Sequence, residues 1–224
     1  MTNDPRDKNF CPKAPTAAEY LLAYSQSVHE AVQKIPADLV NAVFYQLSKT
    51  VENGGRIYIA GNGGSAAIAS HLCCDWMKGT RLDGHPNLKV HSLAENTALL
   101  TALANDVSYE DCFSEQIQMF GEEGDLVVLI SSSGNSPNVV KAAKAAREKK
   151  MSVISFTGFA GGILKEVSDL TLHVPIANYG MVEDGHQMLM HVLAQFLYLT
   201  RSKQTGRPLP MPQPRHESEI PLSV

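Results

Sequence analysis

Residues 125–140 read DLVVLISSSGNSPNVV, the clearest pattern of secondary structure in the chain. Five consecutive aliphatic side chains follow Asp125, a pattern typical of a strand buried on both faces in a parallel sheet. Residues 131–136 then hold four serines and a glycine, and Pro137 suits the first turn of a helix. The stretch therefore predicts a strand, a turn and a helix, which is the repeating unit of an α/β fold.

The same order recurs outward along the chain. Residues 56–60 (RIYIA) predict a strand, followed by the turn GNGGS at 61–65 and a helix to about residue 78. Further strands are expected at 88–93, 153–156 and 170–174, and further helices at 16–34, 36–52, 95–104, 109–120, 136–149, 162–167 and 182–200. This alternation predicts a doubly wound five-stranded parallel sheet flanked by helices, with two N-terminal helices before it.

The two ends of the chain differ from the rest in composition. Residues 1–15 are polar and are expected to form a disordered leader. Thr16 and Glu19 have the spacing of a capping box, which predicts that the first helix begins there. A single domain that includes the N-terminal helices is expected from residue 16 to 202. Residues 203–224 contain five prolines and no apolar periodicity, which predicts a mobile tail.

Composition excludes several classes of protein. The formal net charge of −4 argues against direct nucleic-acid binding, which usually needs a basic face. No apolar run approaches the roughly 20 residues that span a bilayer, and the first residues lack the apolar core of a signal peptide. The four cysteines show no paired spacing of the CxxC kind. We therefore expect a cytoplasmic protein with reduced thiols and no membrane partner.

Two turns that follow predicted strands are suited to holding an anion. The glycines of GNGGS let the backbone approach a ligand, and Ser65 would lie at a helix start, where free N–H groups favour negative charge. The hydroxyls of residues 131–136 can satisfy phosphate oxygens without a lysine. Because the carboxyl ends of parallel strands form the ligand crevice, we expect one shared phosphate site. Neither turn matches a P-loop or carries its lysine, which argues against nucleotide hydrolysis.

Acidic and imidazole side chains on two predicted helices are candidates for proton transfer. His71 and Asp75 are four residues apart and share a helix face, while Glu183 and His191 lie near one face two turns apart. Aldose–ketose isomerisation needs a base that moves a proton between adjacent carbons and an acid that acts on the oxygens. The same four side chains also suit a divalent metal such as zinc, which would polarise a sugar carbonyl. The sequence is compatible with proton transfer by these side chains and with metal binding by them.

The motifs GNGGS (61–65), ISSSGNSPNV (130–139) and HQMLMH (186–191) together resemble the SIS-domain phosphoheptose isomerases. The resemblance covers roughly residues 17–200. It implies an aldose–ketose isomerase that converts sedoheptulose 7-phosphate to D-glycero-D-manno-heptose 7-phosphate. It also implies a homotetramer with sites built between subunits, in which the two N-terminal helices pack against partner subunits.

The resemblance also assigns roles to residues. The implied catalytic residues are Asp75 and His191, with His191 acting as acid, base and metal ligand. From their residue types, His71, Asp75, Glu183 and His191 are the expected ligands of a zinc ion. The resemblance implies that the phosphosugar is bound by Asn62, Ser65, Asp106, Ser131, Ser133 and Ser136. The expected set also includes Gly63, Gly64 and Ser132 of the same two turns, and Glu183 at the position of a family glutamine.

Three positions depart from the family pattern. The catalytic glutamate of the family falls at Asp75. Because the aspartate side chain is one methylene shorter, its carboxylate should lie further from the substrate than that of a glutamate. A misplacement of about 1 Å can cost on the order of a hundredfold in rate. The glutamine of the late helix falls at Glu183, which adds a charge, and an upstream aspartate falls near Gly180.

Two other functions are compatible with the same motifs. One is a non-catalytic SIS protein that binds a phosphosugar, as a sensor, or binds a replication initiator; the retained His191 argues against it. The other is an SIS isomerase for a different phosphosugar, such as a hexose phosphate or an amino-sugar phosphate.

Overall fold

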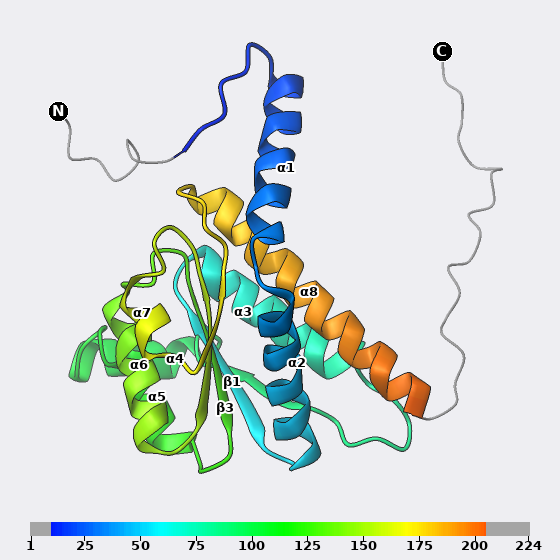
Figure 1. Cartoon of the computed structure of the whole chain (residues 1–224). Coiled ribbons are helices and arrows are strands. Elements are labelled where there is room, and N and C mark those ends of the chain that lie inside the picture. Colours follow the sequence, from blue (N-terminus) through cyan, green and yellow to red (C-terminus); the bar gives the residue numbers. More distant parts are fainter. Residues whose placement is uncertain (1–9, 205–224) are drawn as a thin grey trace, which may run out of the picture.

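The computed structural model describes residues 10–204, and a five-stranded sheet runs through its centre (Figure 1). All neighbouring strands are parallel, in the order β2-β1-β3-β4-β5. Their bounds are β1 Arg56–Gly61, β2 Lys89–Ser92, β3 Leu126–Ser131, β4 Ser152–Thr157 and β5 Leu170–His173. The prediction of a doubly wound five-stranded parallel sheet is confirmed.

The strand order reverses between β1 and β3, and this places the ligand crevice. From β1 the chain crosses to β2 on one side, and from β3 it proceeds through β4 to β5 on the other. Ligands of open α/β sheets bind outside the carboxyl ends of the strands at such a switch point. The two turns predicted to hold phosphate follow β1 and β3, so they meet at this point.

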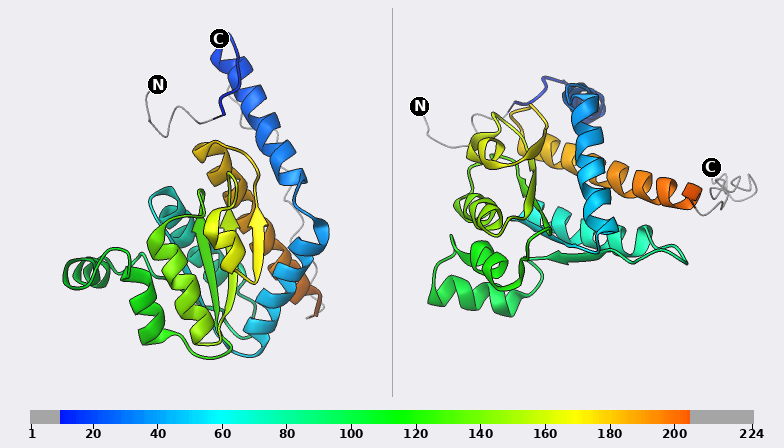
Figure 2. Two further views of the ribbon diagram at one scale, coloured as in Figure 1. Left: turned by 60° about the vertical axis from the view of Figure 1, so that its left-hand side comes forward. Right: turned by 60° about the horizontal axis from the view of Figure 1, so that its bottom comes forward.

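Helices cover both faces of the sheet (Figures 1 and 2). One face packs against α2, α3, η2 and α8, and the other packs against α4, α5, α6 and α7. The bounds are α1 Ala17–Gln33, α2 Ala37–Glu52, α3 Gly64–Cys74, η2 Asp75–Gly79, α4 Thr97–Asp106, α5 Cys112–Phe120, α6 Pro137–Glu148, α7 Gly162–Val167 and α8 Tyr179–Gln204.

Alternating burial along the central strands builds two hydrophobic cores. Ile57 and Ile59 of β1 point into the core with α2, α3 and α8, whereas Tyr58 points into the core with α5 and α6. β3 is buried at every position, as its unbroken aliphatic run predicts. The cores hold the carboxyl ends of β1 and β3 in a fixed relation.

The N-terminal helices are close to their predicted bounds. The Thr16 Oγ1 accepts a hydrogen bond from the backbone N–H of Glu19 at 3.2 Å, so the predicted cap is present. The Thr16 hydroxyl also donates a side-chain hydrogen bond to the Glu19 carboxylate, at 2.9 Å. The first turns of α1 extend beyond the body of the protein (Figure 1), with Leu21 and Leu22 exposed.

Three boundaries differ from the sequence expectations. The helix expected over 65–78 is α-helical only to Cys74 and continues as the π-helix η2. The last helix begins at Tyr179 and runs to Gln204, into the first residues of the expected tail. Phe10, inside the expected disordered leader, exchanges hydrogen bonds with Ala177 and Asn178. Residues 1–9 and 205–224, where disorder and a tail were expected, lie outside the described residues.

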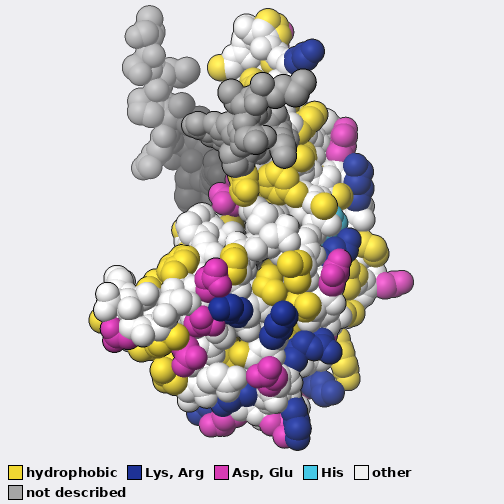
Figure 3. Space-filling model, turned by 90° about the vertical axis from the view of Figure 1, so that its left-hand side faces the viewer, with side chains coloured by type: hydrophobic (Ala, Val, Ile, Leu, Met, Phe, Trp, Pro, Cys, Tyr) yellow, Lys and Arg dark blue, Asp and Glu magenta, His cyan; other side chains and the backbone are white. Residues whose placement is uncertain are grey.

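None of the helices within residues 10–204 is long and apolar enough to cross a membrane. The four cysteines are free thiols, with Cys73 and Cys112 buried and Cys11 and Cys74 exposed. On the face shown in Figure 3, basic and acidic side chains are interspersed. The expectation that no nucleic acid binds directly stays a prediction.

Candidate functional site

The serine turn after β3 is an ordered arrangement of hydroxyls and amides. The Oγ atoms of Ser131 and Ser136 lie 3.3 Å apart, and Ser131 Oγ accepts a hydrogen bond from the Gly134 N–H. Gly134 has a φ of +67°, and a Cβ there would lie 1.8 Å from the carbonyl oxygen of Gly161. Only glycine fits this close approach, so the turn depends on Gly134 to direct its hydroxyls.

The GNGGS turn after β1 is linked to the serine turn by amide side chains. Asn62 exchanges two side-chain hydrogen bonds with Asn138 of α6, at 2.8 and 2.9 Å. Its Oδ1 also accepts a hydrogen bond from the Tyr109 hydroxyl at 2.8 Å. Gly63, with a φ of +54°, leads into α3. The two turns are therefore fixed relative to each other rather than merely adjacent.

A cavity of about 170 Å³ lies between the two turns. Among its lining residues, the Ser132 Oγ is buried and has no hydrogen-bond partner within residues 10–204. This volume is below the roughly 300–1,000 Å³ of pockets that enclose a whole small ligand, so it suits one end of a larger molecule. The lining consists of Asn62, Ser65, Ile130, Ser131, Ser132, Ser133, Ser136, Tyr179 and Glu183.

Helices α3 and α8 run side by side from this cavity. Three contacts join them in succession: Glu183 lies against Gly64, Gln187 bonds to His71, and His191 lies against Asp75. We call this line of contact between the two helices the seam. Ser65 and His71 are six residues apart on α3, which is about 9 Å along a helix axis. The seam thus connects the serine cavity to a cluster of imidazole and carboxylate groups.

That cluster consists of His71, Asp75 and His191. The Nε2 of His71 lies 3.6 Å from Asp75 Oδ1, and the Nε2 of His191 lies 3.5 Å from Asp75 Oδ2. The two imidazole rings pack edge to face, with centroids 5.1 Å apart. All three side chains are partly exposed, so a ligand lying along the seam can reach them.

The same three residues fit a divalent metal. One ligand atom from each lies within 4.8 Å of the others. Two imidazoles and one carboxylate form a donor set that catalytic zinc sites use, with a further position left open. The donor chemistry of this cluster therefore fits the expected metal.

Glu183, the fourth expected metal ligand, lies apart from the other three. Glu183 lies two helical turns before His191, and its carboxylate packs against Gly64 at the serine cavity. It is not part of the His71, Asp75 and His191 cluster. Burial raises the pKa of Glu183, and the neighbouring charge of Asp184 raises it further.

Asp106, expected to bind the sugar, lies away from the serine cavity of its own chain. It is the last residue of α4, is exposed, and accepts a hydrogen bond from the Asn105 side chain at 2.8 Å. It does not line the serine cavity. Helix α4 projects from the body (Figure 2), which explains why its end does not reach the site of its own chain.

His186 shares a motif with His191 but belongs to the core. It is fully buried, and its Nε2 lies 3.1 Å from the carbonyl oxygen of Thr157. Burial lowers its pKa to about 4, so the ring is neutral at physiological pH. Its position on the sheet-facing side of α8 separates it from the seam.

Sequence reasoning gave no role to two residues of the site. Tyr179 lines the serine cavity, but the helix was expected to begin only at residue 182. Helical spacing puts Gln187 on the same side of the last helix as Glu183, but it does not predict the contact of Gln187 with His71.

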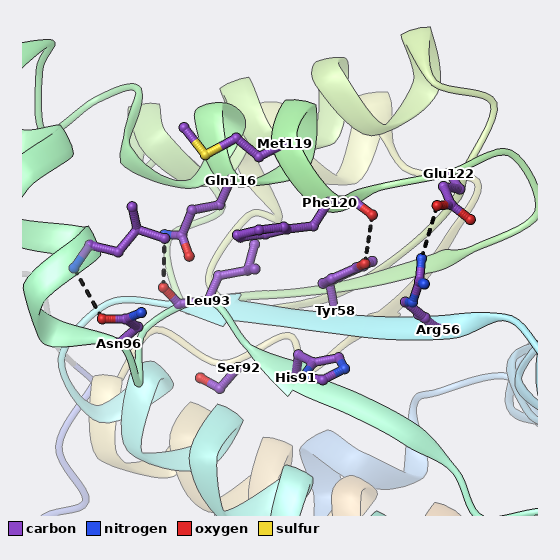
Figure 4. Close-up of a pocket in the computed structure, with 11 residues that line it drawn as sticks. Arg56, Tyr58, His91, Ser92, Leu93, Asn96, Gln116, Met119, Phe120 and Glu122 are labelled. Atoms are coloured by element: carbon purple, nitrogen blue, oxygen red, sulfur yellow. Dashed lines mark hydrogen bonds and ion pairs between the residues drawn. The ribbon is translucent and has the colours of Figure 1, made fainter.

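A larger cavity of about 500 Å³ lies between α5 and the edge strand β2 (Figure 4). Its polar groups bond within the chain: the Tyr58 hydroxyl donates to the Phe120 carbonyl, Gln116 donates to the Leu93 carbonyl, and Arg56 pairs with Glu122. None of the residues predicted for the site lines it. The chemistry therefore concentrates at the serine cavity and the seam.

Comparison with known proteins gives consistent matches. The SIS domain family model matches residues 19–158. The phosphoheptose isomerase of Burkholderia pseudomallei (strain K96243) is 40% identical over 144 residues, which cover 64% of this chain and 73% of the relative. That of Helicobacter pylori (strain P12) is 36% identical over 172 residues, covering 77% and 88%.

Solved structures agree in fold. A phosphoheptose isomerase from Neisseria gonorrhoeae has a TM-score of 0.74 and 32% sequence identity, and the match covers 81% of this chain and 98% of that one. One from Francisella tularensis has a TM-score of 0.76 and 27% identity, covering 81% and 96%.

Proposed function

The chain belongs to the SIS domain family and to its phosphoheptose isomerases, and on this premise we propose that it interconverts sedoheptulose 7-phosphate and D-glycero-D-manno-heptose 7-phosphate. The observation that carries the proposal is the seam between α3 and α8. It joins an anion cavity lined by serine hydroxyls at one end to the Asp75 carboxylate and two imidazoles at the other.

The phosphate end of the sugar binds in the serine cavity. Serine hydroxyls supply the donors, and no lysine or arginine lines the cavity. The orphaned hydroxyl of Ser132 gains a partner when a phosphate oxygen is present. Because the cavity holds little more than the phosphate, the carbon chain extends outward along the seam.

Asp75 and His191 perform the proton chemistry at the other end. The Asp75 carboxylate acts as the base that moves a proton between the two adjacent carbons, and His191 exchanges a proton with their oxygens. Their 3.5 Å separation allows both to act on neighbouring atoms of one substrate.

A zinc ion is proposed as a cofactor held by His71, Asp75 and His191. When bound, it would act as a Lewis acid that polarises the sugar carbonyl. The chain's own side chains orient the substrate and move its protons.

We also propose that the protein is a cytoplasmic homotetramer. Apolar side chains stand exposed on α1 and α8, including Leu21, Leu22, Val192 and Phe196. Burying them between subunits would remove apolar surface from water. Asp106, at the end of a projecting helix, is proposed to complete the site of a neighbouring subunit.

The direct test is turnover. Purified protein incubated with sedoheptulose 7-phosphate should yield the heptose 7-phosphate, detected by NMR as a new aldose signal. Absence of turnover both with added zinc and after chelation would contradict the proposal. Thermal shifts with a panel of hexose and amino-sugar phosphates would then identify another ligand, since a true ligand raises the Tm of the protein as its concentration increases.

A further inference from the structure

Gln187 of α8 contacts one of the imidazoles of the cluster directly. Its Nε2 lies 2.7 Å from the Nδ1 of His71. Gln187 is half-buried and lies one helical turn before His191, on the side of α8 that faces α3. Neither the serine cavity nor the proton chemistry uses this side chain.

The contact determines which nitrogen of His71 faces the site. With Nδ1 held by α8, the Nε2 points toward Asp75, at 3.6 Å from Oδ1. A flip of the ring would break the hydrogen bond to Gln187 and leave the amide without this partner. Partners of this kind orient ligand histidines, and losing one typically weakens metal binding by about 10- to 100-fold.

We propose that Gln187 is the positioning residue of His71, and that its amide presents Nε2 to Asp75 and to a metal held by the cluster. Only the expected change in metal affinity rests on the metal site of the proposed function. The orientation of the ring is a property of the chain itself.

An amide suits this position because one end donates and the other accepts. In the structure the amide nitrogen faces Nδ1. An amide nitrogen only donates, so this arrangement suits a ring whose Nδ1 accepts and whose Nε2 carries the proton. A histidine that ligates a metal through Nε2 needs that lone pair free, with the proton on Nδ1. A half-turn of the Gln187 amide then lets its oxygen accept from Nδ1–H.

Two substitutions separate this role from packing. Gln187→Met keeps the length of the side chain and removes both polar ends, while Gln187→Glu keeps only acceptors. Zinc affinity, measured by competition with a chelator, should fall about 10- to 100-fold in Gln187→Met and stay equal or rise in Gln187→Glu. Gln46→Met is the matched control, since Gln46 bonds to Ser152 away from the seam. Unchanged affinity in Gln187→Met, or equal losses in both Gln187 variants, would overturn the proposal.

A second measurement needs no metal. Nitrogen-15 NMR of His71 in the metal-free protein reports its tautomer. We expect the Nε2–H form in the wild type and the Nδ1–H form in Gln187→Glu; any other pattern overturns the positioning role. A wild type that shows this pattern and binds no zinc would contradict the proposed metal site while leaving the role of Gln187 in place.

Discussion

The Oδ2 of Asp75 lies 3.5 Å from the Nε2 of His191, although the two residues are 116 positions apart in the chain. The side-by-side packing of α3 and α8 creates this relationship. Asp75 is also the first residue of the π-helix η2. Such π-helical turns are frequent at functional sites, where they change the direction of a side chain.

Removing either member of this pair should abolish most turnover and leave binding intact. We expect Asp75→Asn and His191→Ala to lower kcat by about 10²- to 10⁴-fold, the range for loss of an acid or base. The Kd for the phosphosugar should change little, because the serine cavity is untouched. Steady-state kinetics and calorimetric titration measure the two quantities. A fully active Asp75→Asn would show that Asp75 is not the base.

The hydroxyls of the serine cavity should determine the Kd for the phosphosugar. Ser133→Ala and Ser65→Ala each remove a hydroxyl that lines it. Hydrogen bonds to charged groups contribute roughly 1.5–3 kcal/mol, so the Kd for the phosphosugar should rise about 10- to 100-fold. The free sugar, which lacks the phosphate, should bind the variants and the wild type alike. A uniform loss for both compounds would point to misfolding instead.

Glu183→Gln should stabilise the protein at neutral and alkaline pH. Because the pKa of Glu183 is raised in the folded state, its protonated form favours folding. That contribution is complete below the unfolded pKa of about 4.3 and is lost as the pH rises through the folded value. The Tm of Glu183→Gln should therefore exceed that of the wild type at pH ~8 and match it at pH ~4. A difference that is the same at both pH values would contradict this account.

The same substitution should tighten phosphosugar binding. An ionised carboxylate beside a phosphate costs about 1–4 kcal/mol at roughly 4 Å, depending on the local dielectric. We expect the Kd at pH ~8 to fall at least about fivefold in Glu183→Gln. Glu148→Gln, at the exposed end of α6, is the matched control and should bind as the wild type does. Weaker binding in Glu183→Gln would show that the Glu183 carboxylate contacts the sugar favourably.

Mixing two inactive variants tests whether Asp106 serves a neighbouring subunit. Asp106→Asn and Asp75→Asn should each lose activity alone. Tetramers reassembled from both contain sites with an intact Asp75 from one chain and an intact Asp106 from another. Activity should therefore return in part, measured after mixing and refolding. No return of activity, with tetramers shown by light scattering, would contradict a shared site.

The layout of the fold was predictable because local patterns agree with it. The aliphatic run of β3 and the glycine turn after β1 indicate buried parallel strands, and their order places both turns at one edge. The boundaries that failed depend on tertiary contacts. The change to a π-helix at Asp75 has no local signal in the chain, and α8 begins early because Asn178 bonds to the N–H of Met181.

The site was predictable in part for the same reason. Spacing places His71 with Asp75 on one helix, and motif resemblance adds His191. Spacing cannot show that Glu183 would lie at Gly64 and apart from His71, Asp75 and His191, since that depends on how α8 is aligned along α3. The contact of Gln187 with His71 depends on the same alignment.

In the proposed function one phosphosugar spans the seam, with its phosphate in the serine cavity and its reacting carbons beside Asp75 and His191. A crystal structure of Asp75→Asn with sedoheptulose 7-phosphate tests this most directly, because the slow variant retains the substrate. We expect phosphate density within hydrogen-bond distance of Ser65 and Ser133, and the first two carbons next to His191. Phosphate density outside the serine cavity, or a carbon chain directed away from the seam, would contradict it.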